Sequence, residues 1–117
     1  DISSWINELS LSSEQIQVIF VTLDPKRDTV TKLNGYLSNF DETFLGLTGD
    51  ENEILNLSKA WGIYRKIIPT DNVDYSIDHT STIFLINNDR TLKGTIAFRE
   101  SSEVAIKKVR NLIEKNL

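Results

Sequence analysis

A single histidine and an aspartate-containing turn are the residues of this chain whose types and spacing fit metal binding or acid-base chemistry. The histidine, His79, stands just before an apolar stretch, in Tyr75-Ser76-Ile77-Asp78-His79-Thr80. The turn, Asp24-Pro25-Lys26-Arg27-Asp28-Thr29, follows a β-branched and aromatic run that ends at Leu23. An imidazole is a ligand for soft metal ions when thiolates complete the site. Paired carboxylates such as Asp24 and Asp28 serve in proton transfer.

Both features also have a structural interpretation. A lone histidine is more often a packed or surface residue than a ligand. Asp-Pro forms a turn, Asp28 favours the positive end of a helix, and Thr29 is a good helix N-cap. The chain has no cysteine, so within these residues there is no thiolate nucleophile, thiolate ligand or disulfide. It also has no Gly-rich phosphate loop, zinc motif or EF-hand spacing.

Composition indicates one globular domain over residues 1–117. The chain is 39% hydrophobic and 26% charged, with a formal net charge of −4. An acidic chain with scattered Lys and Arg argues against a nucleic-acid partner. The longest apolar run, Val18 to Val21, is far too short to cross a membrane, so any anchor would lie outside this chain. Because there is no methionine and a helical stripe is under way at the first residue, we expect an N-terminally truncated domain.

Apolar periodicity predicts the order α-β-α-β-α-loop-β-β-α. The predicted helices cover residues 2–9, 29–40 and 50–61, plus a C-terminal helix capped by Ser101 or Ser102. The predicted strands are 16–23, covered on both faces, then 44–47, 82–86 and 92–98. Residues 63–80 form a long loop in which Pro69-Thr70-Asp71-Asn72 is able to turn a small hairpin between Tyr64–Ile68 and Asp74–Ile77. In the helices, residues at core-type spacing are expected to be buried: Trp5, Val30, Leu33, Tyr36, Leu37, Phe40, Ile54, Leu57, Trp61, Ala105, Val109, Leu112 and Ile113. Phe98 is expected to pack in the same way at a strand position.

This order predicts an α/β three-layer sandwich with a mixed, mostly parallel sheet. It resembles the second half of a thioredoxin-like fold, in which the first strand lies in the middle of the sheet. That central strand would lie upstream of Asp1, between the strands 16–23 and 82–86. His79 would then stand beside the end of the missing strand.

Three segments, residues 18–29, 44–49 and 75–86, closely resemble the Sco/SenC family in order and spacing, and the likeness extends over almost the whole chain. Members of that family are thioredoxin-like, membrane-tethered proteins that bind copper through a C-x-x-x-C pair and one distal histidine. His79 matches the distal histidine. The cysteine pair would lie upstream of residue 1 and is assigned to no residue here. Asp24, Asp28 and Asp78 are predicted to lie at the edge of the site.

The resemblance implies a copper chaperone that delivers copper to, or reduces, the copper-site cysteines of cytochrome c oxidase. Its implied partners are the copper-site subunit of the oxidase and other copper chaperones or thiol reductants. It would act at the periplasmic face of a bacterial inner membrane, or at the mitochondrial inner membrane facing the intermembrane space, and would not be an enzyme beyond any thiol reduction. Two alternatives stay open: a thioredoxin-like thiol-disulfide oxidoreductase or peroxidase, and a cysteine-less module that binds a partner.

Overall fold

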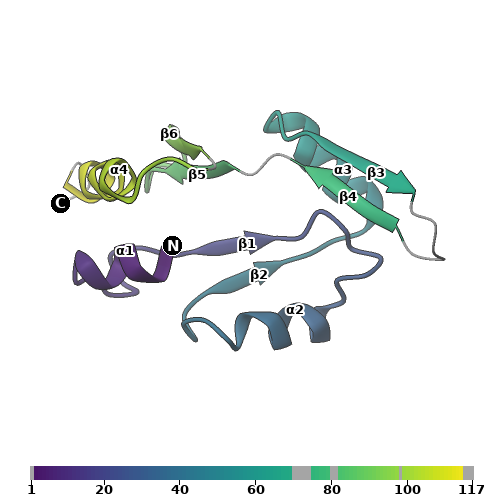
Figure 1. Ribbon diagram of the computed structural model, residues 1–117, viewed down its shortest axis with the longest axis horizontal. Helices are drawn as coiled ribbons and strands as arrows, with labels where there is room; N and C mark the ends of the chain where they lie inside the picture. Colours follow the sequence, from purple (N-terminus) through teal and green to yellow (C-terminus); the bar gives the residue numbers. More distant parts are fainter. Residues whose placement is uncertain (1, 70–74, 80–81, 98, 115–117) are drawn as a thin grey trace. The chain divides into compact units, whose positions relative to one another are not determined.

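The computed structural model describes residues 2–69, 75–79, 82–97 and 99–114. For Arg65, Ile67, Pro69 and residues 75–79, only the backbone is described. The chain divides into two compact units, one formed by Asp1–Gln17 with Ser81–Leu117 and the other by Val18–Thr80. Each unit combines helices with a pair or pairs of strands (Figure 1).

The first unit contains α1 (Ile2–Glu8), β5 (Thr82–Ile86), β6 (Leu92–Ala97) and α4 (Ser102–Glu114). β5 and β6 pair antiparallel, and Ser101 Oγ accepts a hydrogen bond from the backbone N–H of Val104 at the start of α4. Both helices contribute apolar side chains to a core on one face of the hairpin. The buried core residues are Trp5, Leu85, Ile96, Ala105, Ile106 and Val109. The helices and strands of this unit therefore lie close to the positions that the sequence predicts.

The β5–β6 turn places a non-glycine residue in the left-handed region. Arg90 has φ 71°, and its N–H donates to the carbonyl of Asn87 at 2.9 Å. The Asp89 carboxylate accepts hydrogen bonds from the N–H and hydroxyl of Thr91, which lower the Asp89 pKa. These side-chain bonds hold the turn although it lacks the glycine that this conformation favours.

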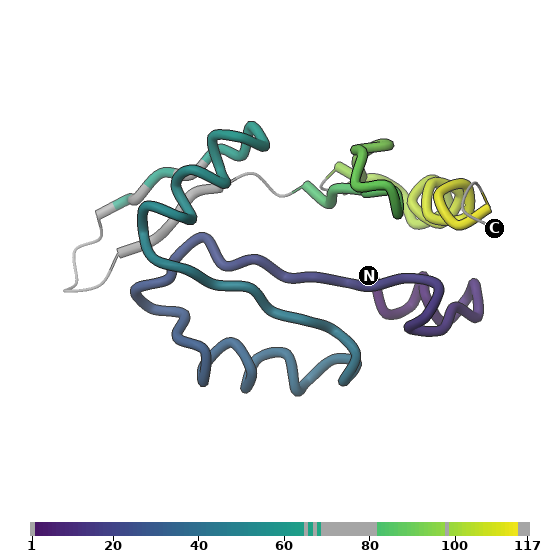
Figure 2. The backbone as a smooth tube through the Cα atoms, turned by 180° about the vertical axis from the view of Figure 1, so that it is seen from behind, coloured from purple at the N-terminus to yellow at the C-terminus, as the bar shows by residue number. Residues whose placement is uncertain are grey.

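The second unit begins with a β-α-β sequence: β1 (Ile19–Val21), α2 (Val30–Leu37) and β2 (Leu45–Leu47). β1 and β2 pair parallel, and the return of the chain between them through α2 can be followed in Figure 2. Gly46 allows α2 to approach β2, because a Cβ at this position would lie 2.7 Å from Leu33 Cδ2. On the same side, the Phe20 ring lies 5.9 Å from the ring of buried Phe44.

The rest of this unit is α3 (Glu51–Ala60) followed by β3 (Arg65–Pro69) and β4 (Tyr75–His79). The predicted capping box is present: Asp50 Oδ1 accepts from the Glu53 N–H at 2.8 Å, and Glu53 Oε1 accepts from the Asp50 N–H at 3.2 Å. Gly62, with φ 65°, follows the end of the helix, as expected. β3 and β4 pair antiparallel, so most of the predicted loop 63–80 is a hairpin.

The predicted order of elements is confirmed, and β3 and β4 form the small hairpin that the sequence allows within the loop 63–80. The sheet content is mixed, and among the described residues one strand pair is parallel and two are antiparallel. The predicted turn at residues 69–72 falls mostly, and Phe98 falls wholly, outside the described residues.

Four predictions about burial were wrong. Val30 and Tyr36 are 62% and 54% exposed, and Phe40 lies beyond the end of α2. The reason is geometric, since β1 and β2 are three residues each and α2 covers them with its Leu33 and Leu37 side. Trp61 is not a core residue but the C-cap of α3, where it is 37% exposed.

The predicted strand 16–23 is also shorter than expected and is covered on one face. Its strand residues are Ile19–Val21, and one face of the β1–β2 pair carries apolar side chains that are all exposed. These side chains are Ile19, Val21, Leu45 and Leu47. Alternation along a strand places Phe20 on the opposite face, against the aromatic residues near α2. Double coverage is therefore not seen for β1.

Candidate metal site

The aspartate turn after β1 is a closed network of hydrogen bonds. Thr22 Oγ1 donates to Asp28 Oδ2 at 2.6 Å and accepts from the backbone N–H of Asp24 at 3.0 Å. Asp24 Oδ2 pairs with Arg27 Nε at 2.5 Å, and the Asp28 N–H donates to the Asp24 carbonyl at 2.9 Å. Thr22 and Asp24 are both 6% exposed. The network fixes both carboxylates at the carboxyl end of β1.

The helix that follows, α2, is capped by the last residue of the same turn. Thr29 is the N-cap of α2, and its Oγ1 accepts a hydrogen bond from the Lys32 N–H at 3.3 Å. The structural interpretation of the turn is therefore confirmed in detail, since Thr29 caps the helix and Asp28 lies just before it. Because the Asp24 carboxylate binds Arg27 and the Asp28 carboxylate binds Thr22, both act here as acceptors within the protein. This pairing gives no support to an acid-base couple.

His79 is the last residue of β4, and Asp78 precedes it in the same strand. The backbone register pairs His79 with Arg65 and Asp78 with Lys66 across the antiparallel ribbon. β3 and β4 lie side by side (Figure 1). His79 and Asp78 thus stand at the β3–β4 end that begins with Arg65, in the same unit as the aspartate turn.

Hydrogen bonds through Thr22 bring Asp24 and Asp28 together. Asp78 and His79 are adjacent in β4. Across the described parts of the chain, no group of three or more His, Cys, Asp or Glu side chains converges on one point. The chain contains one histidine and neither cysteine nor methionine. Among soft donors it therefore supplies a single imidazole, which is one ligand of a copper site and not a complete one.

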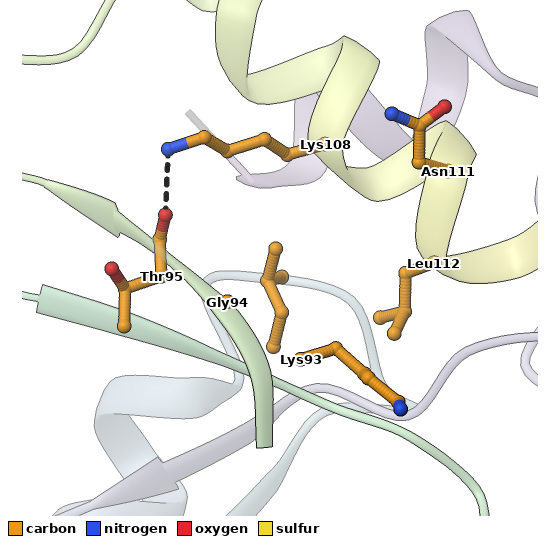
Figure 3. Close-up of a pocket in the computed structure, with 7 residues that line it drawn as sticks. Lys93, Gly94, Thr95, Lys108, Asn111 and Leu112 are labelled. Carbon is orange, nitrogen blue, oxygen red and sulfur yellow. Dashed lines mark hydrogen bonds between the residues drawn. The ribbon is translucent and has the colours of Figure 1, made fainter. Parts of the chain in front are cut away.

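A cavity of about 290 Å³ lies elsewhere, between the β5–β6 hairpin and α4 (Figure 3). Lys108 Nζ, at its rim, donates to the Thr95 carbonyl at 2.8 Å and to Glu100 Oε1 at 2.9 Å, and it forms an ion pair with Glu100 Oε2. The Lys108 ammonium holds the pKa of Glu100 below its ordinary value. Because its lining includes neither histidine nor carboxylate, this cavity does not have the chemistry of the predicted site.

Two residues next to candidate site residues, Thr22 by hydrogen bonds and Arg65 by strand register, were not singled out from the sequence. Thr22 links Asp24 to Asp28, and the signal for it was a hydroxyl two residues before an Asp-Pro turn, since threonine side chains bond to nearby backbone groups. Arg65 faces His79 in the hairpin register, and only strand pairing reveals this relationship. Among the described residues, no helix is long and apolar enough to cross a membrane.

Solved structures similar to this chain include copper-bound proteins. The structure of ScoI from Bradyrhizobium japonicum with copper bound has a TM-score of 0.80 and 31% sequence identity, over 95% of this chain and 71% of that one. Yeast Sco1 with copper bound has a TM-score of 0.82 and 28% identity, over 99% of this chain and 66% of that one. These similarities confirm the predicted α/β, thioredoxin-like fold class.

The curated proteins with similar sequences also include Sco proteins. Mitochondrial SCO1 homolog 2 of Arabidopsis thaliana is 40% identical over 78 residues, 67% of this chain and 28% of that protein. Mitochondrial SCO2 of Saccharomyces cerevisiae is 30% identical over 115 residues, 94% of this chain and 38% of that protein. A SCO2-like protein of Rickettsia prowazekii is 36% identical over 95 residues, 79% of this chain and 46% of that protein. The chain thus spans less than half the length of these relatives.

The family model described as SCO1/SenC matches residues 1–114, which is nearly the whole chain and includes the aspartate turn, the β3–β4 hairpin and His79. The family resemblance carried by the three sequence segments is thereby confirmed. This chain belongs to the SCO1/SenC family.

Proposed function

We propose that the full-length protein that carries this chain binds copper, with His79 as one of its ligands, and passes the metal to a partner. The observation that carries the proposal is the likeness to copper-bound ScoI, at 31% identity over 95% of this chain. A neutral imidazole offers one nitrogen lone pair to a soft ion, and thiolates from outside these 117 residues would complete the site. The domain over residues 1–117 would then be an N-terminally truncated one, whose central strand lies upstream.

We further propose that the partner is the copper-site subunit of cytochrome c oxidase, with other copper chaperones or thiol reductants acting beside it. The mitochondrial Sco relatives support this assignment. On this proposal the protein is membrane-anchored and faces the intermembrane space or the bacterial periplasm. Asp24, Asp28 and Asp78 would form the edge of the site, where the first two already hold a rigid turn.

The role proposed for His79 is tested by His79→Ala in the full-length protein. Copper affinity is measured by competition with a chromophoric chelator, and stability by thermal unfolding. Loss even of groups that only orient a metal ligand costs about 10–100-fold in affinity, so we expect a loss of at least tenfold for the ligand itself. We expect little change in melting temperature.

Two outcomes would overturn the assignment of His79. Unchanged copper affinity in His79→Ala would remove its role as a ligand. A loss of stability above about 3 kcal/mol, as for truncation of a core side chain, would identify a structural histidine.

Thiol-disulfide exchange that survives in the variant while wild-type copper binding is negligible would favour the oxidoreductase. Absence of both activities would favour a module that only binds a partner.

A further inference from the structure

We propose that the cavity between the β5–β6 hairpin and α4 binds a small organic anion, a monocarboxylate with a short hydrocarbon chain, whose charged end is recognised by Lys93. The cavity has a volume of about 290 Å³. Ligand pockets have volumes of about 300–1,000 Å³, so this one fits only a small ligand. All of its lining residues belong to the first unit, and the inference does not rest on copper binding.

The cavity is open because Gly94 has no side chain to fill it. Residues two apart on a strand share one face of the sheet. Ile96, two positions after Gly94, is 2% exposed and packs in the core that includes α4. A Cβ added at Gly94 would lie 4.0 Å from Leu85 Cδ1, so this position has room for further atoms. A glycine inside a strand often marks a place where a ligand approaches closely.

A β-bulge in β6 brings Lys93 to the same cavity. Leu85 pairs with Gly94, but the next residue of β5, Ile86, pairs with Leu92, so Lys93 has no partner in the register. Regular alternation would place Lys93 on the face opposite to Gly94. A bulge redirects a side chain, and Lys93 and Gly94 both line the cavity. The bulge thus adds a charged residue to the space that the glycine leaves open.

The lining combines apolar surface with groups that bind an anion. Leu85 and Leu112 supply the apolar surface, and Asn111 supplies an amide that is able to donate to a carboxylate. Among the described residues, no Asp or Glu lines the cavity. A hydrated inorganic anion would match the charge of Lys93 but would leave the two leucines without a partner. A carboxylate with a hydrocarbon chain matches both parts.

Lys108 also lines the cavity, but its ammonium already has partners. Lys108 Nζ donates to the Thr95 carbonyl at 2.8 Å and to Glu100 Oε1 at 2.9 Å, and the Glu100 carboxylate offsets its charge. Lys93 and Lys108 extend toward different ends of the cavity (Figure 3). Lys93 is exposed, so an anion from solvent has access to it. Recognition of the anion therefore falls to Lys93.

The test uses hexanoate as the probe in the full-length protein that carries this chain, with backbone amide chemical shifts as the readout. We expect saturable shifts centred on Gly94, with a dissociation constant on the order of 1 mM, since the ligand has few atoms. Hexanamide has the same chain without the charge, and it should bind about two- to fivefold more weakly, as for loss of an exposed ion pair. Inorganic phosphate should give no saturable shift at Gly94.

Two variants separate the space from the charge. Gly94→Val places two methyl groups at the cavity and should weaken hexanoate binding by about tenfold or more. Lys93→Gln should weaken it by about two- to fivefold and should remove the preference for hexanoate over hexanamide. Lys107→Gln changes the net charge equally at an exposed position outside the lining, and should have an effect below about 1.5-fold. Gly94→Ala replaces Gly94→Val if that variant does not fold.

Each outcome decides the inference. Absence of saturable shifts at Gly94, or unchanged hexanoate affinity in the filled-cavity variant, would overturn it. Equal affinities for hexanoate and hexanamide would remove the role of the charge, and equal weakening in Lys93→Gln and Lys107→Gln would reduce that role to net charge. Phosphate binding as tight as that of hexanoate would identify a site for inorganic anions instead. Weaker hexanoate binding in Gly94→Val and Lys93→Gln, with wild-type binding in Lys107→Gln, supports the inference.

Discussion

Thr22 and Asp28 are joined by a 2.6 Å hydrogen bond from the threonine hydroxyl to the carboxylate, which ties the end of β1 to the turn before α2. The same hydroxyl accepts the Asp24 N–H at 3.0 Å. Thr22 is 6% exposed, so water has little access to replace either bond. One buried side chain thus holds both the Asp28 carboxylate and the backbone of Asp24.

We expect Thr22→Val to destabilise the protein by about 1–3 kcal/mol, because it leaves the Asp28 carboxylate and the Asp24 N–H without this partner while the side-chain volume hardly changes. The free energy of unfolding from urea denaturation measures the effect. The matched control is Thr43→Val. Thr43 also donates its hydroxyl to an aspartate, Asp41, at 2.8 Å, but it lies on an exposed turn. Losses of equal size at the two threonines would contradict a special role for the buried network.

Local signals predicted much of this fold correctly. Thr29 correctly predicted the start of α2, and Asp50 with Glu53 correctly predicted the start of α3. These starts could be predicted because a capping residue acts on backbone groups only two or three positions away. Burial of α2 was predicted less well. Periodicity identifies an apolar stripe but not the width of the surface that it covers, and the short β1–β2 pair leaves Tyr36 and Val30 exposed.

The candidate site shows the same division between local and long-range information. The Asp24–Thr29 turn could be interpreted from its own residues, and the sequence also identified His79 as the residue to test. The neighbours of His79 could not be identified in this way, because they depend on the register between β3 and β4. A segment interpreted mainly as a loop gives no register, so the position of Arg65 opposite His79 emerged only from the strand pairing.

The close approach of α2 to β2 gives a second prediction. At Gly46, an added Cβ would lie 2.7 Å from Leu33 Cδ2 and 2.8 Å from Leu37 Cδ1, so we expect Gly46→Ala to cost about 1–3 kcal/mol by overpacking. Gly35→Ala is the control. Gly35 lies within α2 with nothing within 4 Å of an added Cβ, and alanine there should stabilise the helix by about 0.5–1 kcal/mol. Thermal unfolding of both variants should show shifts of opposite sign, and shifts of the same sign would contradict the packing of α2 on β2.

The Lys108–Glu100 ion pair gives a prediction about pH. Hydrogen bonding from Lys108 is the largest cause that lowers the Glu100 pKa in the folded protein. A carboxyl group whose pKa is lowered on folding contributes stability above its unfolded pKa, and this contribution is lost as the pH falls through the folded pKa. Since an unperturbed glutamate titrates near pH 4.3, the contribution should be constant near neutral pH and should decline below about pH 4.5.

Lys108→Met tests this linkage because it removes the ammonium and keeps an apolar stem against the hairpin. We expect the difference in unfolding free energy between wild type and Lys108→Met to be constant from about pH 6 to 8 and to shrink as Glu100 protonates. Part of the difference should remain at low pH, because Lys108 Nζ also donates to the Thr95 carbonyl at 2.8 Å, and that bond does not titrate. Lys107→Met, at the exposed neighbouring lysine, should show no such change with pH. A difference for Lys108→Met that stays constant from pH 8 to pH 3 would mean that the carbonyl bond alone accounts for the role of Lys108.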